Sequence, residues 1–399
     1  MAALRENYEI ALDTNATQYI GINLDWNYAK RTLRCSIPGY VKEALEEFMH
    51  ELPKFLCYAP SKAAQRIYGQ RMQFAHIDES DKLTDKEIKY IQKVTGKFLY
   101  YARAVDPTML HALNDIATKT IKGTKETLED VNYFLNYCAC NQDAAALYRA
   151  SDMLLRIDSD AAYLVAPRAR SRAGGFHYLS NKEGTLFNGA IYNLVKVLKH
   201  VCASAAEAEI GALYANAREA TIFRNTLEDM GHPQPPTPIK TDNTTANGIL
   251  DDSMEAKYLK GADMRVNWLK DRVEQNQFEV YWEPAITNLG DYHTKRHGPA
   301  HHRTVRPIYT HQYGKSPETL QGCVNILREE ELAKQRRQSP AAKPAGEERQ
   351  PPAIKKLARV QPLSKPLKPR QTRVRAIVEP PQAHTSATLE QSRISPIVL

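Results

Sequence analysis

The sequence has little cysteine and no long apolar run. Its six cysteines are scattered along 399 residues, and only Cys138 and Cys140 stand close together, which fits neither a disulfide framework nor a zinc site. No stretch of roughly 18 apolar residues is present, and the polar start over residues 1–8 is not typical of a signal peptide. We therefore expect a soluble intracellular protein with reduced thiols and no membrane partner.

The segment from Ala333 to Leu399 lacks aromatic residues altogether but holds ten of the 23 prolines. It carries 14 Lys/Arg against four Asp/Glu, so the net charge of +8 for the whole chain arises there. Such a segment buries too little apolar area to offset the entropy of ordering. We expect a disordered, basic, proline-rich tail over residues 311–399. It either holds nucleic acid or a partner loosely by charge, or is a solvated extension.

The first 150 residues show patterns of a hairpin followed by helices. Alternating apolar residues predict the hairpin, and Thr84 with Glu87 forms a capping-box pattern that predicts the start of a helix. The predicted hairpin and four helices cover residues 19–37, 38–49, 84–104, 107–120 and 124–140. We expect one region over residues 1–60 and a small helical region over residues 61–150.

From residue 151 the periodicity changes, and the predicted order of elements becomes β-β-β-α-β-α-β-α. The expected ranges are 153–158, 174–180, 185–192, 205–230, 238–242, 256–274, 278–282 and 288–297. This order predicts a mixed α/β domain over residues 151–310.

Four acidic residues stand at the ends or starts of these elements: Asp160, Glu209, Asp242 and Asp291. In this order of elements they can converge at one edge of a mixed sheet. Carboxylate oxygens are hard ligands that suit Mg²⁺ or Mn²⁺. Two such ions about 4 Å apart can activate water and stabilise the leaving oxygen in phosphodiester cleavage. The pattern therefore favours a metal-dependent nuclease.

Alternatives exist for several of these acids. Asp158 and Asp160 project on the same face of a strand, so Asp158 is a second candidate for the first metal ligand. Glu207 lies on a different helical face from Glu209. Asp242 or its neighbour Asn243 can cap a helix. Asp291 can also act as an ordinary partner of a helix dipole.

Two groups of basic or polar residues have open roles. Arginines between the first two strands either contact nucleic-acid phosphates or are simply solvated; they are Arg168, Arg170 and Arg172. Four histidines lack the cysteines and the regular spacing of a zinc site, so we expect them on the surface or against nucleic acid. They are His293, His297, His301 and His302.

Five short motifs resemble, in the same order, those of copia-type (Pseudoviridae) LTR retrotransposon polyproteins, where the reverse transcriptase passes into ribonuclease H. The motifs are Ser159–Tyr163, Ser204–Glu209, Thr241–Asn243, Ala262–Arg265 and Asn288–Lys295. Upstream, Tyr19–Ile22, Val94–Ala102 and Asp106–Pro107 resemble the end of the polymerase part. The resemblance covers most of residues 19–297.

The resemblance implies a ribonuclease H-like five-stranded mixed sheet with flanking helices, preceded by the end of a polymerase palm and a thumb-like or connection-like helical region. It implies Mg²⁺-dependent endonucleolytic hydrolysis of the RNA strand of RNA–DNA hybrids. The four acids would hold two Mg²⁺ ions, or Mn²⁺ in their place, with no small-molecule cofactor. The expected partners are the hybrid and other polyprotein chains. The expected location is the cytoplasm or virus-like particles, with access to the nucleus.

The chain also departs from this family. No Tyr-x-Asp-Asp motif is present, so we expect no polymerase activity, and Ala162 stands where the family has a second acid. These departures leave a second hypothesis, in which the chain is a truncated, catalytically inactive remnant that binds nucleic acid or other proteins.

Overall fold

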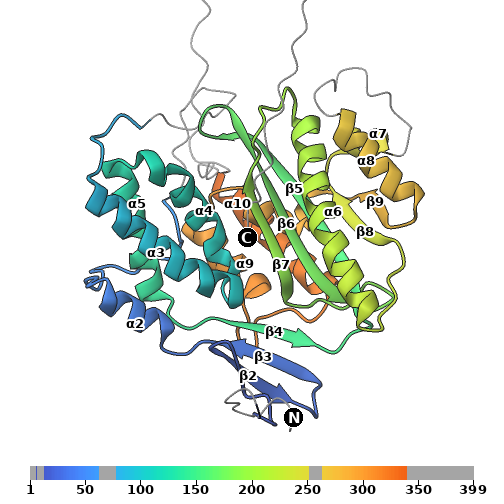
Figure 1. Cartoon of the computed structure of the whole chain (residues 1–399), viewed down its shortest axis with the longest axis horizontal. Coiled ribbons are helices and arrows are strands. Elements are labelled where there is room, and N and C mark those ends of the chain that lie inside the picture. Colours follow the sequence, from blue (N-terminus) through green and yellow to red (C-terminus); the bar gives the residue numbers. More distant parts are fainter. Residues whose placement is uncertain (1–5, 7–12, 63–77, 251–262, 339–399) are drawn as a thin grey trace, which may run out of the picture. The chain divides into compact units, whose positions relative to one another are not determined.

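The described part of the chain in the computed structural model comprises residues 6, 13–62, 78–250 and 263–338. It contains a four-stranded antiparallel sheet, a group of helices and a five-stranded mixed sheet (Figure 1). The tail from residue 339 onward lies outside the described residues. So does the beginning of the helix predicted over residues 256–274.

The small sheet has the strand order β1-β2-β3-β4 with antiparallel neighbours. Its strands are β1 Gln18–Tyr19, β2 Ile22–Asn27, β3 Thr32–Ser36 and β4 Ala145–Arg149. Gly21 has a φ of +81°, which permits the tight turn between the first two strands. The predicted hairpin is thus present. Because β4 follows the helices in sequence, the sheet spans both predicted regions, 1–60 and 61–150.

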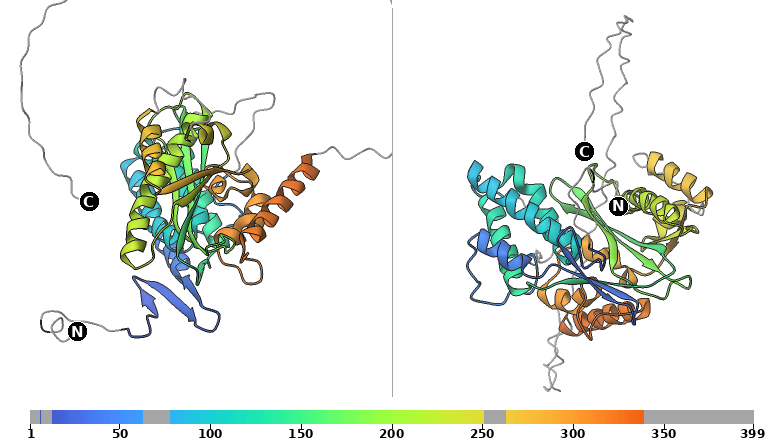
Figure 2. Two further views of the ribbon diagram at one scale, coloured as in Figure 1. Left: turned by 90° about the vertical axis from the view of Figure 1, so that its right-hand side faces the viewer. Right: turned by 60° about the horizontal axis from the view of Figure 1, so that its bottom comes forward.

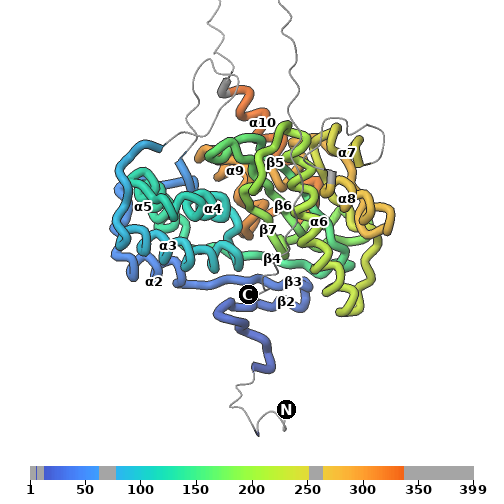
Figure 3. The backbone as a smooth tube through the Cα atoms, turned by 45° about the horizontal axis from the view of Figure 1, so that its top comes forward, coloured from blue at the N-terminus to red at the C-terminus, as the bar shows by residue number. Residues whose placement is uncertain are grey.

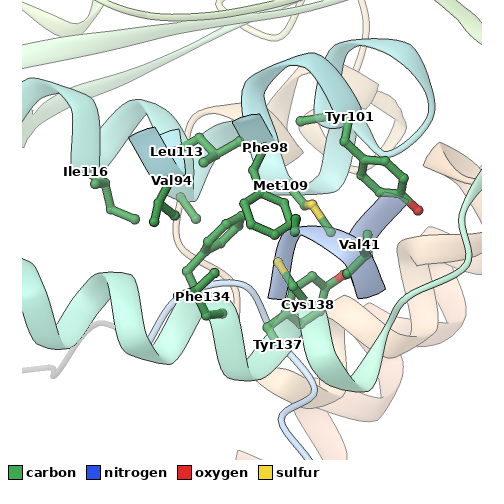
Figure 4. Packing of buried hydrophobic residues seen from close by; sticks show 14 of the residues in the cluster. Val41, Val94, Phe98, Tyr101, Met109, Leu113, Ile116, Phe134, Tyr137 and Cys138 are labelled. Atoms are coloured by element: carbon green, nitrogen blue, oxygen red, sulfur yellow. The ribbon is translucent and has the colours of Figure 1, made fainter. Parts of the chain in front are cut away.

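Among the described residues, the helical region contains four α-helices and two 3₁₀ turns. These are α2 Tyr40–Glu47, α3 Asp85–Ala104, η1 Pro107–Met109, α4 Leu110–Lys119, η2 Thr120–Lys122 and α5 Lys125–Cys140. Thr84 and Glu87 form the predicted capping box at the start of α3. The helices enclose a core in which the rings of Phe98 and Phe134 meet edge to face, with centroids 5.3 Å apart (Figure 4).

The mixed sheet has the strand order β7-β6-β5-β8-β9. The strands β5, β6 and β7 follow one another in sequence and pair antiparallel. The strands β8 and β9 run parallel to β5. The strands are β5 Leu154–Ala166, β6 Arg170–Ser180, β7 Ala190–Val197, β8 Thr237–Thr241 and β9 Phe278–Trp282. This is the five-stranded mixed sheet that the resemblance implies.

One predicted strand is displaced along the sequence. Residues 185–192 were expected to pair, but β7 begins at Ala190. The side-chain oxygen of Asn181 accepts hydrogen bonds from the backbone N–H groups of Thr185 and Leu186. This turn occupies the start of the predicted strand, because an Asn side chain offers the backbone a partner in place of a ladder.

Helices cover both faces of the mixed sheet (Figures 1 and 2). One face packs against α6 Ala205–Asp229, α7 Thr244–Leu250 and α8 Asp263–Glu274. The opposite face packs against η4 Leu289–His293, α9 Pro299–Tyr309 and α10 Leu320–Gln338, with η3 Ala285–Thr287 preceding them. Within the described ranges, none of the helices combines the length and the apolar character needed to cross a bilayer.

The helix α10 corrects the expected start of the disordered tail. The sequence predicts that the tail begins at residue 311, yet Leu320–Gln338 is helical. Cys323 is buried, and Leu320, Ile326 and Leu327 pack against the same core as α9. These apolar residues recur at helical spacing, which the overall basic and proline-rich composition of the segment conceals.

The helical region contacts the mixed sheet through α4, which lies beside β7 (Figure 3). Buried polar contacts also join the two parts. Arg306 of α9 donates to Asp106 at 2.8 Å, and the Tyr137 hydroxyl lies 2.9 Å from Nε2 of His302. The helical region and the mixed sheet therefore share an interface with defined polar geometry.

Candidate functional site

Three of the predicted acids meet at the end of the mixed sheet. Asp158 of β5 pairs in register with Lys240 of β8, so Asp160 and Asp242 lie level with each other two residues further on. Glu209 comes from the start of α6. One carboxylate oxygen from each of Asp160, Glu209 and Asp242 lies within 4.8 Å of the other two. We call these three residues the acidic cluster.

Capping residues fix the elements that carry the cluster. Ser204 is the N-cap of α6 and accepts a hydrogen bond from the Glu207 backbone, which places Glu209 in the second turn. Asn243 accepts a hydrogen bond from Ala246 N at 2.9 Å. Asn243 therefore caps α7, and the carboxylate of Asp242 is left for the cluster.

The acidic cluster is largely buried and strongly repulsive. Only 1% of Asp160 and 5% of Glu209 is exposed. Burial and the nearby Asp291 raise the pKa of Asp160 to about 7, and burial with Asp160 raises the pKa of Glu209 well above its ordinary value. Burial also raises the pKa of Asp242. Carboxylates gathered in this way favour either protons or a cation.

The hydrogen bonds of the cluster leave oxygen atoms available. Glu209 Oε1 accepts from the backbone N of Ala161 at 3.1 Å, and Asp160 Oδ2 accepts from the Thr294 hydroxyl at 2.5 Å. Glu209 Oε2 is buried and accepts no hydrogen bond from any residue within the described ranges. A buried oxygen without a donor calls for a further partner. The donor set, three carboxylates, fits Mg²⁺ or Mn²⁺.

Asp291, the fourth predicted acid, stands beside the cluster and forms an ion pair with Lys295. It is not one of the three residues whose oxygens converge. Although burial opposes a charge on Lys295, Asp291 and Asp160 raise the pKa of Lys295 above its ordinary value. The ammonium group of Lys295 therefore supplies positive charge where the four acids meet. Thr294 and Lys295 belong to the motif Asn288–Lys295, but the sequence alone does not indicate their roles, because their partners Asp160 and Asp291 are brought to them by the fold.

Asp158 projects on the same face of β5 as Asp160, as predicted, but its carboxylate has other partners. Its Oδ2 atom lies 3.2 Å from Nζ of Lys240 and accepts from the backbone N of Leu289 at 2.9 Å. Both Asp158 and Lys240 are 1% exposed. The carboxylate of Asp158 thus serves a buried ion pair, and the structure favours Asp160 for the cluster.

For Arg172, both expected alternatives, a phosphate contact and a solvated side chain, are wrong. Arg172 belongs to β6, is 2% exposed, and donates to Asn114 and Asp115 of α4. Arg168 is exposed in the turn between β5 and β6, and Arg170 is half-buried at the start of β6. Only these two remain available to contact phosphates. Strand alternation could not identify the buried arginine because its partners lie far away in the sequence.

The expectation that the four histidines lie at the surface is also wrong. His293 and His302 are buried, and His297 and His301 are half-buried with stacked rings whose centroids are 4.4 Å apart. Burial lowers the pKa of His302 to about 3. These side chains belong to an aromatic core between η4, α9 and α5.

Comparison with known proteins gives one sequence relative and several solved structures; no family model matches the chain. The chain is 23% identical over 283 residues to the retrovirus-related Pol polyprotein from transposon TNT 1-94 of Nicotiana tabacum. The matched part is 70% of this chain and 20% of that polyprotein, so the chain spans about a fifth of its relative.

The solved structures include ribonucleases H and a reverse transcriptase. LC11-RNase H1, isolated from compost, has a TM-score of 0.28 and 12% identity, over 35% of this chain and 92% of that one. RNase H1 from Halobacterium salinarum has a TM-score of 0.24 and 15% identity, over 34% and 90%. Prototype foamy virus protease-reverse transcriptase has a TM-score of 0.23 and 13% identity, over 33% and 17%.

The sequence relative confirms the predicted resemblance to a retrotransposon polyprotein. The strand order and strand directions of the mixed sheet, with helices on both faces, confirm the predicted ribonuclease H-like fold. The chain is therefore similar to part of a retrotransposon Pol polyprotein and contains a mixed sheet with the ribonuclease H-like strand order.

Proposed function

We propose that this chain cleaves the RNA strand of RNA–DNA hybrids endonucleolytically and requires Mg²⁺ or Mn²⁺. The observation that carries the proposal is the acidic cluster, in which oxygens of Asp160, Glu209 and Asp242 lie within 4.8 Å of one another. Burial of these carboxylates adds to the argument, because a buried group of acids is costly unless a cation neutralises it.

The residues of the site have different roles in the proposed reaction. Asp160, Glu209 and Asp242 would hold the divalent ions, with Asp291 completing the site. When bound, two such ions supply an activated water and stabilise the leaving oxygen of the phosphodiester. Thr294 keeps the carboxylate of Asp160 in place through its hydroxyl. The partly buried site thereby orients its acids before substrate arrives.

The substrate would be recognised mainly by its shape. A ribonuclease that acts on hybrids recognises the 2′-hydroxyls and phosphates of its substrate and does not read the base sequence. Arg168 in the β5–β6 turn and Arg170 at the start of β6 are the basic residues that we propose as phosphate contacts. We also propose that the chain works in the cytoplasm or in virus-like particles, where other polyprotein chains supply DNA synthesis.

The test is cleavage of a hybrid labelled on the RNA strand, with and without Mg²⁺. We expect the wild type to cut only with the metal and Asp242→Asn to be at least about 100-fold slower, since a metal-binding charge is lost. Glu279→Gln is the matched control, because Glu279 is an exposed acid on the neighbouring strand β9. Equal rates for the wild type and Asp242→Asn would refute the assignment.

A second candidate function is binding of nucleic acid without cleavage. Two observations favour it: Ala162 stands in place of an acid, and Lys295 already neutralises Asp291. In this case the cleavage assay gives no metal-dependent product, and a gel-shift measurement with the same labelled hybrid shows equal binding by the wild type and Asp242→Asn.

A further inference from the structure

Three consecutive residues after η4 link the acidic cluster to the helical region. Thr294 donates to Asp160, Lys295 pairs with Asp291, and Arg296 pairs with Asp115 of α4. The first two contacts lie within the candidate site. The third reaches a helix that is more than 150 residues earlier in the chain and outside the mixed-sheet domain.

Asp115 forms two ion pairs at once. Its Oδ1 atom accepts from Arg172 at 2.9 Å, and its Oδ2 atom accepts from Nε of Arg296 at 3.0 Å and from the same guanidinium's Nη2. The side chain of Asp115 is 11% exposed, and that of Arg172 only 2%. Paired donation by one guanidinium to one carboxylate oxygen fixes the orientation of Arg296.

The two arginines bound by Asp115 flank the acidic cluster. Arg172 lies opposite Ala162 in the β5–β6 ladder, two residues beyond the level of Asp160. Arg296 directly follows Lys295. The single carboxylate of α4 therefore holds both the strand beside Asp160 and the segment that carries Thr294 and Lys295.

Charges around this contact favour the ionised carboxylate. Burial alone would raise the pKa of Asp115, but Arg296 and Arg172 hold it below its ordinary value. His111 is buried nearby, and burial with Arg172 lowers its pKa well below the ordinary range. His111 is therefore neutral, and the cationic partners of Asp115 are the two arginines, with Lys119 further away.

We propose that Arg296, held by Asp115, is a positioning residue through which the helical region sets the geometry of the metal site. This inference rests on the proposed function and deepens it. Groups behind the ligands of a metal orient those ligands and tune their affinity, and their loss commonly weakens metal binding about 10–100-fold. Full affinity for the metal would thus require that the helical region keeps Asp115 in contact with Arg296.

The test measures Mn²⁺ affinity by isothermal titration calorimetry on the full chain, with hybrid cleavage as a second readout. We expect about tenfold weaker Mn²⁺ binding for Arg296→Gln. Arg296→Lys keeps the charge without the paired donation, so its affinity should be intermediate. The control is Lys119→Gln. Lys119 is a cation of α4, the helix that carries Asp115, but its Nζ atom pairs with Asp130 at 3.0 Å. This variant should bind Mn²⁺ like the wild type.

Folding of the variants is checked by thermal unfolding in EDTA. Arg296→Gln leaves the pair between Asp115 and Arg172 in place, so its fold should persist. If it does not, the affinity of Arg296→Lys decides the question. Wild-type affinity in the folded Arg296 variants overturns the inference, while a wild type that neither binds Mn²⁺ nor cleaves overturns the proposed function itself.

Discussion

Removing the charge of Asp158 or of Asp160 should change stability in opposite directions, although the two residues lie on the same face of β5. Asp160 sits in the acidic cluster, where its pKa rises from 3.8 to about 7. A rise of this size corresponds to about 4 kcal/mol that ionisation of Asp160 costs the folded, metal-free protein at neutral pH or above. Asp160→Asn removes this cost and keeps the shape of the side chain.

The gain in Asp160→Asn should be smaller than that limit. Lys295 loses one of the carboxylates that surround it, and the Thr294 hydroxyl then faces a neutral amide instead of a charge. We therefore expect the free energy of unfolding to rise by about 1–3 kcal/mol. At about 2–4 °C per kcal/mol for a domain of this size, the melting temperature rises by several degrees.

Asp158→Asn should have the opposite effect. The variant leaves the ammonium group of Lys240, which is 1% exposed, without its buried partner. Breaking such a pair costs about 3–5 kcal/mol. Glu283 lies 3.2 Å from the same Nζ atom and is 42% exposed, so it retains part of the interaction. We expect a loss of about 3 kcal/mol.

The assay is urea unfolding at pH 8 in EDTA, repeated with saturating Mn²⁺. Asp160→Asn should be more stable than the wild type in EDTA and should gain little from Mn²⁺. Asp158→Asn should be less stable but should still be stabilised by Mn²⁺. Equal destabilisation of both variants, or loss of the Mn²⁺ effect in Asp158→Asn alone, would refute the separation of the two roles.

Because the raised pKa values make the folded state bind more protons than the unfolded state, metal-free stability should fall as pH rises from about 4 to above 7. Mn²⁺ should then raise the melting temperature more at pH 8 than at pH 5, and an equal rise at both would contradict this. Lys295→Met removes the internal cation, so calorimetry should show tighter Mn²⁺ binding while EDTA-treated protein melts earlier; weaker binding argues against it. Phe98→Ala leaves a cavity in the core of the helical region and should lower the free energy of unfolding, measured in urea, by about 3–5 kcal/mol. A loss below about 1 kcal/mol would contradict the burial of Phe98 in that core.

Several elements were predictable because local signals agree with the tertiary structure. β9 occupies the predicted range 278–282, and α6 starts at the predicted Ala205. Thr84 caps α3 as its pattern indicates. In these segments the apolar spacing, the caps and the burial all favour the same structure.

Other features depend on partners that are distant in sequence. A period of two places Asp158 and Asp160 on one face, but only the position of Lys240 shows that Asp158 is already paired. Arg172 likewise appears solvated until α4 brings Asp115 against it. The composition of residues 311–399 does not predict the helix α10, because the basic, proline-rich remainder of the segment outweighs the buried face formed by Cys323 and its neighbours.

The most direct test of the metal site is anomalous diffraction from crystals of the full chain soaked in Mn²⁺. The acidic cluster predicts a strong peak in contact with carboxylate oxygens of Asp160, Glu209 and Asp242, at about the 2.0–2.1 Å typical of Mg²⁺, for which Mn²⁺ stands in. A peak beside Asp158, a peak only among the histidines, or no peak at saturating Mn²⁺ would contradict the proposal that these three acids form a metal-dependent nuclease site.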